Sequence, residues 1–199
     1  MSITRFSGGG SGRSYGGRRR LEHWYRDNQV HLITARCRDR RACFAGEPAK
    51  VVFWDRFAHY TQAHGFTPWV TSLLDNHYHI LGYLRRGDDL GPMMRKLHGS
   101  VAKLVNDQLD AAGQERHLPF WKQTANHDYF DGCLRDEKQG RASYRYVCIQ
   151  GQRHGVVRGW REYPHTRVGV ELERAITRAL QLGAFLEGVP YRRCGEGKK

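Results

Sequence analysis

The feature that most constrains the fold of this chain is an apolar stretch interrupted by one pair of turn residues. Residues 67–86, TPWVTSLLDNHYHILGYLRR, contain two apolar runs separated by Asp75 and Asn76. Aspartate and asparagine tolerate the backbone angles of tight turns. The pattern therefore predicts two strands joined as a hairpin, which makes the sheet antiparallel at this point.

The segments on either side predict further strands and helices. Residues 29–37, QVHLITARC, have the composition of a strand, and a short strand is expected near 129–134. Apolar residues at helical spacing predict helices over 49–65, 89–113, 135–150 and 170–187. Hairpin-connected strands mixed with crossover helices favour an α+β fold: a ferredoxin-like antiparallel sheet with helices packed on one face, plus a C-terminal helix.

The length of 199 residues suits one folded domain with an appendage. Residues 1–20 are rich in Gly, Ser and Arg and are expected to form a flexible basic arm. Residues 21–160 are expected to form the main domain and 161–199 a helical extension. Because no apolar run is long enough to span a bilayer and no apolar signal core is visible, we expect a cytoplasmic protein with no membrane partner.

Charge and cysteine content narrow the class of protein further. Lys and Arg together number 33 against 20 Asp and Glu, a formal net charge of +13. Such an excess favours a polyanionic partner, most often nucleic acid, although a basic soluble surface would also explain it. The cysteines are scattered, without a C-x-x-C pair, which is typical of reduced cytosolic thiols rather than of disulfides or a zinc site. They are Cys37, Cys43, Cys133, Cys148 and Cys194.

The second run of the hairpin contains His77 and His79 in the sequence DNHYHIL. Side chains two residues apart on a strand lie on the same face. The pair is either structural or a pair of metal ligands, because neutral imidazole is a common ligand of divalent ions. The pattern alone does not decide between these interpretations.

A second candidate feature lies in SYRYVCIQGQRHGVV, residues 143–157. Tyr146 and Gln150 are four residues apart and would share one face of a helix, presenting a phenol and an amide oxygen together. Tyr144 would point away from Gln150. The alternative is that Tyr146, like Val147 and Ile149, is an ordinary core residue.

Taken together, these motifs resemble the single-tyrosine transposases of the HUH (histidine–hydrophobe–histidine) endonuclease superfamily, in particular the REP-associated tyrosine transposases. The resemblance covers roughly residues 22–160, and its segments are VHLITARCRDRRACFAG, DNHYHIL, FWKQTANHDYFDGCLRDEKQ and YRYVCIQGQRHGVV. Two positions depart from the family pattern. Asp75 and Gly151 each stand where the family usually has proline.

The resemblance implies an enzyme, a transposase that nicks and joins DNA in transposition and recombination. Tyr146 falls on the family's nucleophile, and His77, His79 and Gln150 fall on its metal ligands. A divalent ion, Mg²⁺ or Mn²⁺, would polarise the scissile phosphate. Tyr146 would form a covalent 5′-phosphotyrosine on single-stranded DNA beside a hairpin. The family includes monomers and homodimers, and its members act in the bacterial cytosol or nucleoid.

Basic side chains near these motifs are candidate DNA contacts. They are Arg85, Arg86, Arg95, Lys96, Lys138, Arg141, Arg145 and Arg153. Phe120 and Trp121 would either stack on bases or belong to the core.

Two alternatives to the nuclease remain open at this point. One is a non-catalytic, domesticated transposase relative that binds structured DNA or RNA. The other is a zinc-dependent hydrolase built on the histidine pair, for which the sequence offers few acidic ligands, since only Asp75 is close.

Overall fold

The computed structural model describes residues 26–123 and 128–186, so the expected basic arm at 1–20 lies outside the described residues. The described residues form a five-stranded antiparallel sheet in the order β4-β1-β3-β2-β5. The strands are β1 (Gln29–Arg36), β2 (Phe66–Leu73), β3 (His77–Leu84), β4 (Tyr129–Cys133) and β5 (Thr166–Val168). The predicted antiparallel hairpin and the α+β fold class are confirmed.

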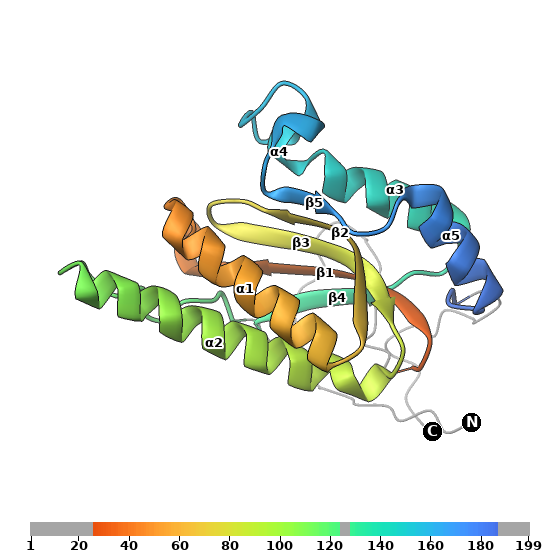
Figure 1. Cartoon of the computed structure of the whole chain (residues 1–199), viewed down its shortest axis with the longest axis horizontal. Helices are drawn as coiled ribbons and strands as arrows, with labels where there is room; N and C mark the ends of the chain where they lie inside the picture. The colour runs from red at the N-terminus through yellow and green to blue at the C-terminus, as the bar shows by residue number, and fades with distance from the viewer. Residues whose placement is uncertain (1–25, 124–127, 187–199) are drawn as a thin grey trace, which may run out of the picture.

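Helices cover both faces of this sheet (Figure 1). They are α1 (Glu47–Ala63), α2 (Leu90–Ala111), α3 (Glu137–Cys148), the short α4 (Gln150–Arg153) and α5 (Leu172–Gln181). We expected the helices to pack on one face. In the structure, α1 and α2 pack on one face, and α3 and α5 pack on the opposite face. Both faces are covered because β3 directs buried side chains to each of them.

Successive side chains of β3 point to opposite faces of the sheet and therefore pack against different helices. Tyr78, Ile80 and Leu84 pack with α1 and α2, whereas Leu81 packs with α3 and α5. Since residues two apart share a face, His77 and His79 lie on the α3 side with Leu81. The histidine pair is therefore directed at the helix that contains Tyr146.

The turn between β2 and β3 is held by backbone hydrogen bonds to the segment that follows β1. The amide of Cys37 donates to the carbonyl of Asn76 (2.8 Å), and the amide of Phe44 donates to that of Asp75 (2.8 Å). The Asp75 carboxylate also pairs with Lys50 of α1 at 2.8 Å. These contacts hold the backbone of the turn in place. The family pattern has a proline at the position of Asp75, and the proline ring would restrict the backbone directly.

The core between the sheet and the α1–α2 layer includes aromatic side chains from the segment after α2. Phe120 and Trp121 are buried, and the indole N–H of Trp121 donates to the carbonyl of His98. The core interpretation of these two residues is therefore correct, and neither is available to stack on a base.

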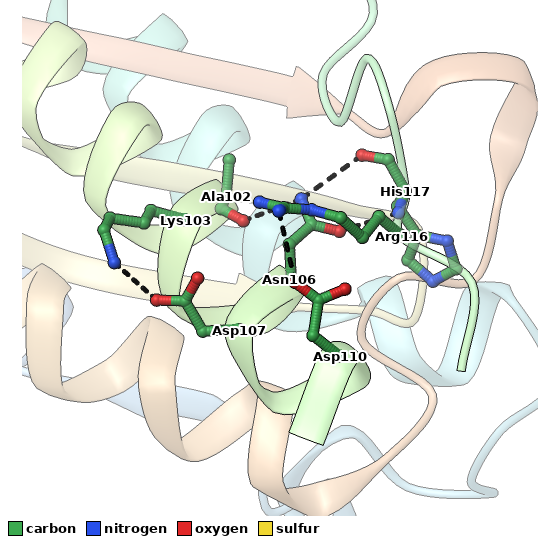
Figure 2. A network of polar contacts seen from close by, with 7 residues as sticks. All are labelled: Ala102, Lys103, Asn106, Asp107, Asp110, Arg116 and His117. Atoms are coloured by element: carbon green, nitrogen blue, oxygen red, sulfur yellow. Dashed lines mark hydrogen bonds and ion pairs between the residues drawn. The ribbon is translucent and has the colours of Figure 1, made fainter. Parts of the chain in front are cut away.

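A buried asparagine fastens the chain where it leaves α2 (Figure 2). The amide nitrogen of Asn106 donates to the carbonyls of Ala102 (2.9 Å) and His117 (3.4 Å), and its oxygen accepts from the amide of His117 (2.7 Å). The Asn106 side chain thus bonds to backbone groups of α2 and of the segment after it. It therefore holds the segment that contains His117 against α2.

Residues after 160 add β5 and α5 to the fold, although the boundary at 160/161 itself stays a prediction. β5 pairs with the outer edge of β2, and α5 packs against α3. Gly140 allows this helix contact, because a Cβ there would come within 3.0 Å of Ile176. Within the two described ranges, no helix combines the length and apolar character needed to cross a bilayer.

Candidate active site between the histidine strand and the tyrosine helix

His77 and His79 lie side by side on β3, with ring centroids 5.1 Å apart. Nδ1 of His77 is 2.6 Å from Oδ1 of Asn76, and Nδ1 of His79 is 2.8 Å from Oγ1 of Thr34 on β1. The amide nitrogen of Asn76 donates to the carbonyl of Arg40 (3.3 Å), which turns its oxygen toward His77. Each ring thus uses Nδ1 for a supporting contact and keeps Nε2 for a ligand, the arrangement common in histidine metal sites.

Both imidazoles are held in the neutral form that binds metals. Burial, reinforced by the charges of His154 and Arg36, lowers the pKa of His77 from 6.5 to about 4. Burial together with the neighbouring histidines lowers the pKa of His79 to about 3. At neutral pH, therefore, a cation meets two lone pairs rather than two protonated rings.

Tyr146 comes to this site from α3. The helix begins at Asp136, whose side chain caps it by accepting from the amide of Gln139 at 2.7 Å. Ten residues further on, the Tyr146 ring packs edge-on against His79 with a centroid separation of 5.1 Å. It is only partly buried, so its hydroxyl-bearing ring lies beside the histidines without being enclosed in the core.

Gln150 is the first residue of α4 and is 1% exposed. Its amide nitrogen donates to the carbonyl of Tyr146 at 2.6 Å, which leaves Oε1 as the free acceptor. Gly151 permits this arrangement, because a Cβ there would approach the Tyr163 ring to 2.7 Å. Glycine thus takes the family's proline position for a packing reason.

Tyr144, the other tyrosine of the helix, points elsewhere. Its hydroxyl donates to the carbonyl of Val170 at 2.9 Å, and the residue is buried in the α3–α5 core. Burial raises its pKa well above the ordinary value. Tyr144 is therefore a structural residue, and Tyr146 is the tyrosine that faces the histidines.

The candidate DNA-contacting residues fall into four places. Arg145 and Arg153 lie with the tyrosine helix, and the Arg153 guanidinium sits 5.5 Å from the Tyr146 ring centroid. Lys138 is exposed in the first turn of α3, whereas Arg141 beside it is tied to Glu137 and Glu173. The remaining four lie away from Tyr146. Arg85 and Arg86 follow the far end of β3, and Arg95 and Lys96 are on α2 across the sheet.

Two residues next to the site had no role in the sequence analysis. The His154 ring lies 5.0 Å from that of His77. Its position four residues after Gln150 places it on the same helical face, which is the signal that could have found it. Arg36 pairs with His77 across β1 and β3, a relationship that only the strand register reveals.

By donor chemistry, the ring nitrogens of His77 and His79 and the amide oxygen of Gln150 are groups that could hold a divalent ion. Across the described part of the chain, no three side chains of the His, Cys, Asp or Glu type are arranged to hold a metal. A metal site here therefore depends on Gln150 as the third ligand, which is the set that the resemblance implied.

The chain was compared with protein families, curated proteins and solved structures, and only the solved structures gave matches. No protein-family model and no curated protein sequence matches the chain. A solved REP-associated tyrosine transposase bound to a REP hairpin aligns with a TM-score of 0.57 and 16% identity, covering 94% of this chain and 98% of that one. This chain therefore has the fold of that transposase, as the resemblance implied.

A second solved structure, of a suspected transposase from Deinococcus radiodurans, aligns over 68% of this chain and 95% of that one. Its TM-score of 0.44 and identity of 11% are too low to bear on the fold.

Proposed function

We propose that this protein is a metal-dependent endonuclease and strand transferase that acts on single-stranded DNA through Tyr146. The observation that carries the proposal is the contact of Tyr146 with His79, with Gln150 one helical turn further on. The tyrosine and the two histidines lie together although they come from segments far apart in the sequence.

The chemistry is an in-line exchange at phosphorus. Oη of Tyr146 forms a bond to phosphorus, the bond from phosphorus to the 3′ oxygen breaks, and the phenol proton passes to the leaving oxygen. The products are a 5′-phosphotyrosine and a free 3′-OH. Because one phosphodiester replaces another, the reverse reaction with a 3′-OH can rejoin strands at the same residue.

The metal ligands we propose are Nε2 of His77, Nε2 of His79 and Oε1 of Gln150. An ion of the Mg²⁺ or Mn²⁺ class held there would polarise the scissile phosphate. A free phenol has a pKa of about 10, so attack needs a positive environment that favours phenolate. The Arg153 guanidinium, 5.5 Å from the centroid of the Tyr146 ring, is placed to meet the charge of the phosphate.

We propose a single strand beside a hairpin as the substrate, and the structurally similar transposase was solved with a REP hairpin. A single strand can bring its backbone to a site between a strand and a helix more easily than a base-paired backbone can. The contact of Tyr146 with His79 within one chain supports the proposal that one copy can supply the site. We place this activity in the bacterial cytosol or nucleoid.

The proposal is tested with the full chain and 5′- or 3′-labelled hairpin DNA carrying single-stranded flanks. We expect an adduct that survives denaturation, requires Mg²⁺ or Mn²⁺, and is lost with chelator and in Tyr146→Phe. Tyr144→Phe is the matched control. Hairpin binding without an adduct under any metal condition would instead favour the non-catalytic relative that binds structured nucleic acid.

A further inference from the structure

The candidate metal site lacks compensating negative charge. None of its three proposed ligands is a carboxylate, since two are imidazoles and Gln150 is an amide. The carboxylate next in sequence, Asp75, is already paired with Lys50. Arg153 adds a positive charge over Tyr146. A divalent ion would therefore enter a region that is already positive, and a bound anion would lower the cost of placing it there.

Arg36 adds a second guanidinium from the opposite wall of the site. It ends β1 and is directly paired with His77 of β3, so the two side chains lie on the same face of the sheet. Thr34, two residues earlier on that face, contacts His79. Arg36 thus lies on the sheet beside the histidines, whereas Arg153 lies on α4 and over the Tyr146 ring.

Among residues 26–123 and 128–186, no carboxylate pairs with the Arg36 side chain. It is exposed, and within the described residues it forms no ion pair. In the same RCRDRR segment, by contrast, Arg38 pairs with Asp39, and Arg41 donates to the carbonyl of Leu118. An exposed guanidinium without a counterion beside neutral ligands is a suitable anion contact.

We propose that Arg36 is a phosphate-binding residue that holds the DNA strand from the sheet side, opposite Arg153, and that phosphate and metal therefore bind cooperatively. This inference rests on the proposed function and adds a residue to it. Arg36 repels a metal ion in the free protein and attracts the phosphate that removes that repulsion. Since linkage is reciprocal, DNA strengthens metal binding and metal strengthens DNA binding by the same factor.

The proposal predicts opposite effects of one substitution on two affinities. Arg36→Gln removes a positive charge near the metal, so Mn²⁺ should bind the free protein about threefold more tightly. The same change removes a phosphate contact, so single-stranded DNA should bind roughly tenfold more weakly. A purely structural role of Arg36 would weaken both.

The experiment measures Mn²⁺ binding by electron paramagnetic resonance and binding of a fluorescent oligothymidine in chelator. It uses the full chain with Arg36→Gln, Arg36→Lys and Arg56→Gln, the last removing the same charge from α1 across the sheet. The slope of the logarithm of the DNA-binding constant against the logarithm of the salt concentration reports the number of phosphate contacts. We expect Arg36→Gln to reduce the magnitude of this slope by about 0.7, the contribution of one phosphate contact on a single strand. Arg36→Lys should keep most of that dependence, and Arg56→Gln should behave as the wild type.

DNA affinity and salt dependence in Arg36→Gln that match Arg56→Gln would overturn the proposal, as would a loss of Mn²⁺ affinity in Arg36→Gln. Because DNA binding is measured in chelator, it tests the phosphate contact of Arg36 independently of metal binding. Absence of Mn²⁺ binding by the wild type would therefore count against the proposed metal site and the cooperativity, separately from the phosphate contact.

Discussion

The ring of Tyr146 lies edge-on against the ring of His79, with centroids 5.1 Å apart. This contact is on the sheet face where the buried His77 and His79 lie next to α3. Tyr144, two residues earlier, is bonded to the carbonyl of Val170 instead. Two tyrosines in one turn of α3 thus have different surroundings, and they are expected to respond differently to substitution.

Tyr144→Phe should reduce stability and leave the chemistry in place. The substitution removes the hydrogen bond to Val170, at a cost of about 1 kcal/mol, which for a chain of this size lowers the unfolding temperature by roughly 2–4 °C. Thermal unfolding and DNA adduct yield measure the two effects. Loss of adduct in a folded Tyr144→Phe protein would contradict the assignment of roles.

Asn76→Ala should weaken metal binding, although Asn76 itself is not a ligand. The substitution removes the acceptor that holds Nδ1 of His77, and loss of such a supporting contact typically reduces metal affinity about 10- to 100-fold. Asn76→Asp keeps an acceptor and is the matched variant, expected to retain most of the affinity. Titration with Mn²⁺ compares them, and equal affinity of Asn76→Ala and wild type would refute the supporting role.

Stability in chelator should fall as the pH is lowered through the range in which unfolded histidine titrates. Burial lowers the pKa values of His31 and His77 to about 4 and of His79 to about 3, so from pH 6.5 downward the unfolded chain binds more protons. Stability is therefore complete above pH 6.5 and declines below it, by up to about 1.4 kcal/mol per pH unit for each histidine.

Urea unfolding at a series of pH values between 4 and 7 measures this decline. The double variant His77→Asn with His79→Asn should retain only the part due to other groups such as His31. A pH dependence as steep as that of the wild type in this variant would show that the two site histidines do not titrate as their burial requires.

Gly151→Ala should disturb the site through packing. A Cβ would lie 2.7 Å from the Tyr163 ring, which is itself held by its hydroxyl bond to the carbonyl of Leu73. Overpacking of this kind costs about 1–3 kcal/mol and would shift α4 and Gln150. Gln152→Ala, at the exposed next position, is the control. Unchanged stability and metal affinity in Gly151→Ala would show that the helix accommodates the methyl group.

Elements set by local pattern could be predicted from the sequence. The hairpin around Asp75 and Asn76, the strand at 29–37 and the long helix ending near Gly113 depend on turn chemistry and apolar spacing within one window, and each is present. β5 could not be predicted, because its three residues carry too little pattern and form a strand only by pairing with β2.

The site was predictable only where its partners lie close in sequence. Tyr146 and Gln150 share a helix face, and His77 and His79 share a strand face, so each pair could be identified locally. Arg36 was not identified, because its closeness to His77 comes from strand register. His154 was not identified either, although its spacing from Gln150 is a local signal, because its contact with His77 depends on how the chain after α3 packs on the sheet. The neutral state of the histidines likewise depends on burial that no local pattern specifies.

The most direct measurement of the central claim is mass spectrometry of the adduct after nuclease and protease digestion. The account predicts that the peptide containing Tyr146 carries a 5′-linked nucleotide on the tyrosine oxygen in the presence of Mg²⁺ or Mn²⁺. A nucleotide attached to any other residue, or no covalent attachment with a hairpin substrate that the protein binds, would contradict it.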